Sequence, residues 1–204
     1  MRTENIKVKL RDGTMGAYVA YPDKTPVGAI IAIMEIWGVN DTMRKHAHEF
    51  AEAGSVCLVP DLFWRQEAGV ELSDHHPDQV QKAFHLYYEF DYDLGVRDVE
   101  DTWHYLEKIR SATASRRGRL LPRRQALLPD VLSHRHRLCG SLLRHLHRAP
   151  HQGGEKLHPL VTIHKYPGAD HAFARHGGRT YSKPEADPAL GLTVDFFKRH
   201  LKSA

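Results

Sequence analysis

The sequence contains little cysteine and no long apolar run. Its 2 cysteines, Cys57 and Cys139, are too few for the disulfide framework that stabilises small secreted domains. No stretch reaches the roughly 18 apolar residues of a transmembrane helix, and the opening MRTENIKVKL lacks the apolar core of a signal peptide. We therefore expect a cytoplasmic protein without a membrane partner, folded as a single domain over residues 1–204.

Aromatic residues are absent from one segment, residues 111–157, and positive charge is concentrated there instead. The segment holds nine Arg and one Lys against one Asp and one Glu, a net charge of +8 in a chain whose total is +4. The other residues therefore sum to −4, so the basic character belongs to this segment and not to the chain as a whole. No helical or strand period fits the segment, because its leucines come in adjacent pairs and Pro122 and Pro129 would interrupt a helix.

The N-terminal part of the chain has clear strand and helix patterns. Residues 6–10 and 16–22 alternate in hydrophobicity around the turn RDGTM, which predicts an antiparallel pair of strands. Residues 27–38 and 55–63 are apolar runs typical of buried strands. Between them, residues 40–54 begin with N-cap candidates and end in glycine, which predicts a helix. Strand, helix and strand in this order indicate a parallel sheet.

The C-terminal part adds helices and one strand. Residues 77–110 are helical in pattern, in two pieces divided near DYDLG. The second piece places apolar residues on one face: Val96, Val99, Trp103, Leu106 and Ile109. Residues 159–168 predict a further strand, and residues 189–201 a closing amphipathic helix.

Three stretches of sequence carry a family resemblance. They are MEIWGVNDTMRKHAHEFAEAGSVCLVPDLFWRQEAGVELSD, EFDYDLGVRDVEDTWHYL and YPGADHAFARHGGRTYSKPEADPALGLTVDFFKRHL. They resemble the dienelactone hydrolase family, α/β hydrolases that open a lactone or ester through a cysteine nucleophile. The resemblance extends over about residues 5–110 and 158–202. It implies an α/β-hydrolase fold, a mostly parallel sheet with helices on both faces, in which residues 111–157 would disrupt the central strand and the elbow.

Five residues are candidates for the site. Glu35 follows a buried apolar run, so it should lie at the carboxyl edge of the sheet, where a partly desolvated carboxylate can hold or release a proton. His171 follows a predicted strand and should lie on a loop at the same edge. Taken alone, these positions also fit a surface carboxylate and a solvated histidine. The resemblance implies that His171 is the base that activates the thiol, that Arg175 binds a substrate carboxylate, and that Phe173 and Trp37 line the substrate pocket.

Two catalytic parts of the family are missing. The family's nucleophile stands in a Gly-x-Cys-x-Gly elbow, and the chain contains no such motif. Cys139 lacks the preceding glycine and strand, while Cys57 lies within a predicted strand as a small core residue. The strand and loop that should supply an Asp to orient His171 are also absent. The family's second substrate-binding arginine should fall near PDQVQKAFHLYYEF, which contains no Arg.

The segment that replaces the elbow can be interpreted as a shifted reading frame. Codons can be chosen for Arg119 to Val131 that, regrouped from their second base, read G-Y-C-L-G-G-K-L-C-Y-L-M, which resembles the missing elbow. Residues 134–137 and 142–150 regroup to T-D-I-D and Y-Y-G-T-Y-I-E-H-R in the same manner. We therefore interpret residues 111–157 as a frameshifted translation, with the frame restored before HPLVTIH and one strand deleted.

Two other interpretations of this segment remain. A basic arm would contact nucleic-acid phosphates, but paired leucines and the lack of an aromatic residue to stack on a base argue against it, and we expect no nucleic-acid partner. The triplets HRH and HLH could be metal ligands. Histidines two apart share a face only in a strand, however, and Cys139 is the only thiol nearby, so we expect no metal site.

The sequence therefore predicts a carboxylic ester hydrolase of the dienelactone hydrolase family with a defect. The resemblance implies a small-molecule lactone or ester as substrate, a Cys-His-Asp type site and no cofactor. Because the elbow and the orienting Asp are missing, we predict that this chain is inactive. The alternatives are a non-catalytic, frameshifted or pseudogene-like product and a basic interaction module.

Overall fold

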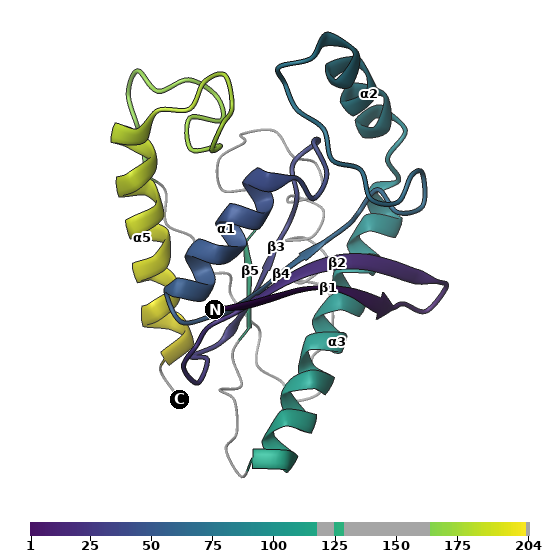
Figure 1. Ribbon diagram of the computed structural model, residues 1–204, viewed down its shortest axis with the longest axis vertical. Helices are drawn as coiled ribbons and strands as arrows, with labels where there is room; N and C mark the ends of the chain where they lie inside the picture. Colours follow the sequence, from purple (N-terminus) through teal and green to yellow (C-terminus); the bar gives the residue numbers. More distant parts are fainter. Residues whose placement is uncertain (118–124, 129–163, 203–204) are drawn as a thin grey trace.

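A computed structural model describes residues 1–117, 125–128 and 164–202 of the chain (Figure 1). Its five strands form one sheet in the order β1-β2-β4-β3-β5. The strands are β1 (Arg2–Lys9), β2 (Thr14–Tyr21), β3 (Ala29–Ala32), β4 (Val56–Pro60) and β5 (Gln125–Leu128). The helices are α1 (Asp41–Glu52), α2 (Pro77–Tyr88), α3 (Tyr92–Arg117) and α5 (Lys183–Lys202).

The direction of the strands confirms a mostly parallel sheet. β3 pairs in parallel with both β4 and β5, while β2 pairs antiparallel with both β1 and β4. Among the five described strands, β2 is thus the one that runs against the others. Figure 1 shows the strands between α1 and α5 on one side and α3 on the other, so both faces of the sheet are covered.

Helix α1 begins and ends as its sequence predicts. The Asn40 side chain accepts a hydrogen bond from the backbone N–H of Met43, which satisfies one of the free donors of the first turn. The helix packs Met43, Ala47, Phe50 and Ala51 into the core, and Phe50 meets Phe197 of α5 at 5.9 Å between ring centroids. Gly54 then takes a φ of +101°, a left-handed conformation that glycine adopts without strain, and the chain turns into β4.

The central strand is shorter than the predicted strand over residues 27–38. Ladder pairing ends at Ala32, although Ile33 and Met34 stay buried. The next residues turn away because Gly38, with a φ of +76°, forms an antiparallel bridge to Glu71 in the loop after β4. A side chain at Gly38 would meet the Val70 carbonyl oxygen at 1.9 Å, so the turn requires glycine. Glu35 is therefore placed on a turn beyond the strand.

Part of the anomalous segment has regular structure. The predicted division of residues 77–110 into two helices is confirmed, but α3 continues to Arg117, and Gln125–Leu128 form β5 beside β3. The prediction that no regular element fits residues 111–157 is therefore wrong for these two pieces. The strand pairs all four of its residues with β3, which gives the open edge of β3 a partner. The remaining residues of the segment lie outside the described part of the chain.

The C-terminal elements are partly confirmed. α5 contains the predicted helix over residues 189–201 and starts earlier, at Lys183. The predicted strand over residues 159–168 lies largely outside the described residues, and its described end, residues 164–168, is not a strand. Within the described part of the chain, no helix combines the length and the apolar character needed to cross a membrane.

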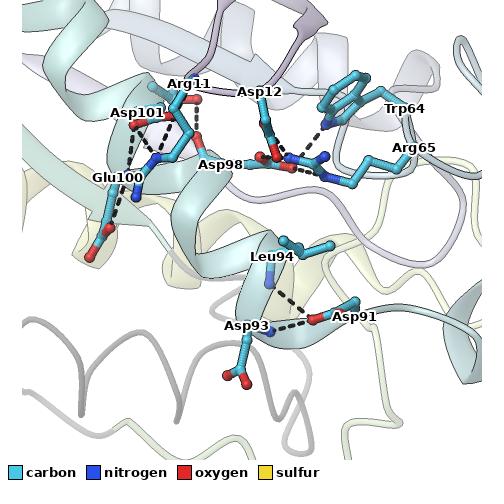
Figure 2. A network of polar contacts seen from close by, with 11 residues as sticks. Arg11, Asp12, Trp64, Arg65, Asp91, Asp93, Leu94, Asp98, Glu100 and Asp101 are labelled. Atoms are coloured by element: carbon cyan, nitrogen blue, oxygen red, sulfur yellow. Dashed lines mark hydrogen bonds and ion pairs between the residues drawn. The ribbon is translucent and has the colours of Figure 1, made fainter.

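A network of ion pairs fastens α3 to the rest of the molecule (Figure 2). Asp98, 1% exposed, accepts hydrogen bonds from Trp64 Nε1 at 2.8 Å and from Arg65 Nη2 at 2.7 Å. Arg65 also pairs with Asp12, and Asp101 of α3 pairs with Arg11. Asp12 and Arg11 lie in the turn between β1 and β2. The network joins this turn and the loop after β4 to one helix face.

Candidate active site

A buried arginine connects the turn after β3 with the loop before α5. Arg175 is 7% exposed, and its Nε lies 3.7 Å from Glu35 Oε2. Its Nη2 forms an ion pair and hydrogen bond with Asp74 Oδ2. The guanidinium carbon lies 5.0 Å from the centroid of a Trp37 ring, a cation–π distance. The structure thus brings together three of the predicted site residues, Glu35, Trp37 and Arg175.

The arginine is tightly enclosed yet incompletely hydrogen-bonded. A Cβ on Gly178 would lie 2.6 Å from Arg175 Nε, so the absence of a side chain there leaves room for the guanidinium. Among the described residues, Arg175 Nε has no hydrogen-bond partner, because the 3.7 Å to Glu35 is too long for one. A buried donor in this condition is costly, and a catalytic role or a bound water or ion is among the explanations for such a group.

The sequence did not predict Asp74, which holds this arginine. Asp74 also accepts a hydrogen bond from the backbone N–H of Arg179 at 3.0 Å. Burial raises the pKa of Asp74, but the Arg179 N–H and the Arg175 charge outweigh burial and leave the pKa below its usual value. The residue is ionised at neutral pH and fixes both ends of the loop segment 175–179. Its position in ELSD, at the end of a matching stretch, was the available signal.

The other two predicted residues lie on the same loop. His171 is exposed, and its backbone carbonyl accepts a hydrogen bond from Thr180 Oγ1 at 2.6 Å. The next residue, Ala172, has a φ of +63°, a left-handed conformation unusual for a residue with a side chain. Phe173 is buried and packs against Tyr166, with 5.0 Å between ring centroids. The loop thus exposes the histidine and buries the phenylalanine and arginine that follow it.

Glu35 borders two cavities. The larger, about 60 Å³, lies between α1, α5 and the loop and is mostly apolar; its wall includes Met43, Phe50, Ala186, Ala189 and Leu190. The smaller, about 30 Å³, is aromatic, with Phe63, Tyr87, Phe90 and Tyr92 in its wall. A carboxylate shared by two apolar cavities is a favourable place for proton transfer to a bound molecule.

A second polar cluster lies on the wall of the larger cavity. His46 Nδ1 is 2.9 Å from Glu49 Oε2, and His176 Nε2 is 2.7 Å from Glu49 Oε1. Burial lowers the pKa of His176. Burial alone would raise the pKa of Glu49, but the two histidines together lower it. The carboxylate is therefore ionised at neutral pH. The spacing His-x-x-Glu on one predicted helix is the sequence signal for two members of this cluster.

The described part of the chain contains one cysteine, Cys57, and it lies in the core. Cys57 is fully buried in β4, and burial raises the pKa of its thiol. This confirms the prediction that Cys57 is a core residue. Cys139 lies outside the described residues.

Known proteins are similar to this chain in fold and in sequence. A provisionally assigned dienelactone hydrolase from Klebsiella pneumoniae superimposes with a TM-score of 0.67 over 97% of this chain and 98% of its own, at 16% identity. The fold is that of an α/β hydrolase. A model of the dienelactone hydrolase family matches residues 15–118 and 148–201. The chain belongs to the dienelactone hydrolase family, a family of hydrolases.

Two relatives extend the match over nearly the whole chain. A provisionally named carboxymethylenebutenolidase of Azospirillum brasilense is 36% identical over 220 residues, which cover 93% of this chain and 95% of the relative. A carboxymethylenebutenolidase of Pseudomonas putida is 29% identical over 227 residues, or 96% of each chain. The family model leaves residues 119–147 unmatched, and these lie inside the anomalous segment 111–157.

Proposed function

We propose that this chain carries the substrate-binding side of a lactone or ester hydrolase but lacks its nucleophile. One observation carries the proposal: Glu35, Trp37 and Arg175 are assembled at the sheet edge, while no Gly-x-Cys-x-Gly motif occurs in the 204 residues. Among the described residues the one thiol, Cys57, is buried in a strand. In this proposal the chain keeps the groups that bind the substrate and lacks the group that reacts with it.

In this proposal, the lack of the cysteine thiol removes the nucleophilic attack from the family's reaction. In the family's reaction a thiolate attacks the carbonyl carbon of the lactone or ester, the bond from that carbon to the leaving oxygen breaks, and water hydrolyses the thioester. His171 would take the thiol proton and later activate the water. Without a thiol at the elbow, neither the attack nor the thioester can occur, and only a residual rate from polarisation of the carbonyl is left.

The lining of the aromatic cavity supports a proposal for one group of the substrate. Its walls hold aromatic side chains beside Glu35, and the α2 sequence contains no Arg. An apolar acyl or aryl group fits such a lining better than a second carboxylate does. We therefore propose an ester or lactone that carries an apolar acyl or aryl group and a single carboxylate, with Arg175 as the cation available to that carboxylate.

The origin of the defect is part of the proposal. We propose that residues 111–157 are a frameshifted translation, which is consistent with the unmatched range 119–147 inside them. Sequencing the gene tests this directly. Codons for Arg119 to Arg124 that regroup to G-Y-C-L-G-G are the expected result, and codons incompatible with that reading would refute the frameshift.

Hydrolysis of p-nitrophenyl acetate by the purified chain tests the function. We expect a slow rate that iodoacetamide does not change and that His171→Ala leaves unaltered, because no thiol is available for the histidine to activate. Turnover abolished by iodoacetamide would contradict the missing nucleophile. In that case Cys139→Ser would show whether the second cysteine supplies the thiol, with Cys57→Ser as the matched control.

A further inference from the structure

Three potential metal ligands from two distant parts of the chain meet on the wall of the larger cavity. His46 and Glu49 lie three residues apart on α1, a spacing that places both on one helix face. His176 comes from the loop before α5. One ligand atom from each residue can be chosen so that all three lie within 4.8 Å of one another.

The surroundings of this cluster suit an ion. The three side chains are between 14 and 17% exposed, so they are partly desolvated but still accessible. The three residues all line the apolar cavity of about 60 Å³, which is large enough for water molecules.

We propose that His46, Glu49 and His176 form a binding site for one divalent transition-metal ion, with Zn²⁺ as the ion that best fits two imidazoles and one carboxylate. Three protein ligands leave one position of a tetrahedral ion open, and the cavity lies beside it. The ion replaces the two hydrogen bonds of Glu49 with bonds to metal. It links α1 to the loop that carries Arg175, and so fixes one wall of the candidate active site.

A second pair of the same spacing provides a contrast. His104 Nδ1 and Glu107 Oε2 on α3 are 3.3 Å apart, also three residues apart in sequence. Both side chains are exposed, at 65% and 44%, and the described residues place no second histidine beside them in a metal-binding group. His-x-x-Glu spacing alone therefore does not form the proposed site. The third ligand and the cavity wall distinguish the α1 cluster.

Calorimetric titration of the full chain, without a His tag, with Zn²⁺ tests the site. We expect one ion per chain, an affinity lowered at least about tenfold in His176→Gln, and an unchanged affinity in the matched control His104→Gln. We also expect the bound ion to raise the melting temperature of the unsubstituted chain, because it binds the folded state. Failure to bind Zn²⁺, or wild-type affinity in His176→Gln, would overturn the proposal.

Two further measurements keep the test decisive. If His176→Gln does not melt cooperatively, His46→Gln takes its place, and Co²⁺ bound to the unsubstituted chain should show the visible absorption of a tetrahedral site. Absence of these bands would count against the proposal. A double variant, His134→Gln with His136→Gln, should bind as well as the unsubstituted chain. A loss of binding in that variant would assign the ion to the basic segment instead.

Discussion

Asp98 and Arg175 are buried charged side chains in two regions of the molecule, and the two regions satisfy their charges differently. On the α3 side, Asp98 is 1% exposed and receives hydrogen bonds from Trp64 and from two nitrogens of Arg65 (Figure 2). At the sheet edge, Arg175 is 7% exposed and faces two carboxylates, Asp74 and Glu35. Among the described residues, however, Arg175 Nε remains without a hydrogen bond.

This difference suggests a structural role for the Asp98 network and a binding role for the Arg175 arrangement. The Asp98 network pairs its buried charge with donors on neighbouring segments, so it can hold α3 in place and needs nothing further. The Arg175 arrangement retains a buried donor, a neighbouring carboxylate and adjacent cavities, which are the features that we would expect of a binding site. We therefore expect substitutions in the first region to change stability most, and substitutions in the second to change stability less and binding more.

The largest effect is expected at Asp98. Replacing it with alanine removes the acceptor of Trp64 Nε1 and the buried partner of Arg65, and breaking a buried ion pair typically costs about 3 kcal/mol or more. Urea denaturation of Asp98→Ala should show a loss of this size in the free energy of unfolding. The matched control, Asp195→Ala on the exposed face of α5, should stay within about 0.5 kcal/mol of wild type. Similar losses in both variants would contradict a structural role for the network.

A smaller effect is expected where the arginine is enclosed. In Gly178→Ala the new Cβ would lie 2.6 Å from Arg175 Nε, so the guanidinium must shift within its enclosure, at a cost of about 1–2 kcal/mol. The same change at Gly191, an exposed helix position with no atom within 4 Å of the added carbon, should instead stabilise by about 0.5–1 kcal/mol. Urea denaturation measures the free energy of unfolding of both variants. Equal effects would mean that Gly178 does not make room for the arginine.

Much of the fold could be predicted because its signals are local. The antiparallel strands alternate in hydrophobicity, and Asn40 caps α1 within three residues of the N–H that it binds. The end of β3 could not be predicted, because Ile33 and Met34 are buried by packing beyond the ladder and an apolar run does not distinguish the two conditions. β5 could not be predicted either, since its pairing depends on the open edge of β3 and not on its own pattern.

In the candidate site, prediction from sequence is limited by contacts between residues that are far apart along the chain. Glu35, Trp37 and Arg175 could be chosen from stretches that resemble a family. Asp74 ends one of these stretches, but its contact with Arg175 spans 101 residues of sequence and could not be predicted. The contact between Glu49 and His176 spans 127 residues, and only the folded chain brings the two together. A spacing motif on one helix supplies part of such a cluster, while the remainder comes from tertiary structure.

The smallest effect tests how the α3 network responds to acid. Hydrogen bonding to Arg11 lowers the pKa of Asp101 below its usual value of 3.8, so the folded state favours the ionised carboxylate. The resulting stability is fully present above pH 3.8 and is lost as the pH falls through the lower folded pKa. Asp101→Asn should therefore be less stable than wild type by about 1 kcal/mol at pH 7, since Arg11 is half exposed, and the difference should shrink towards pH 2. Unfolding free energies at both pH values measure it, and a difference independent of pH would show that the pair contributes through packing and not through charge.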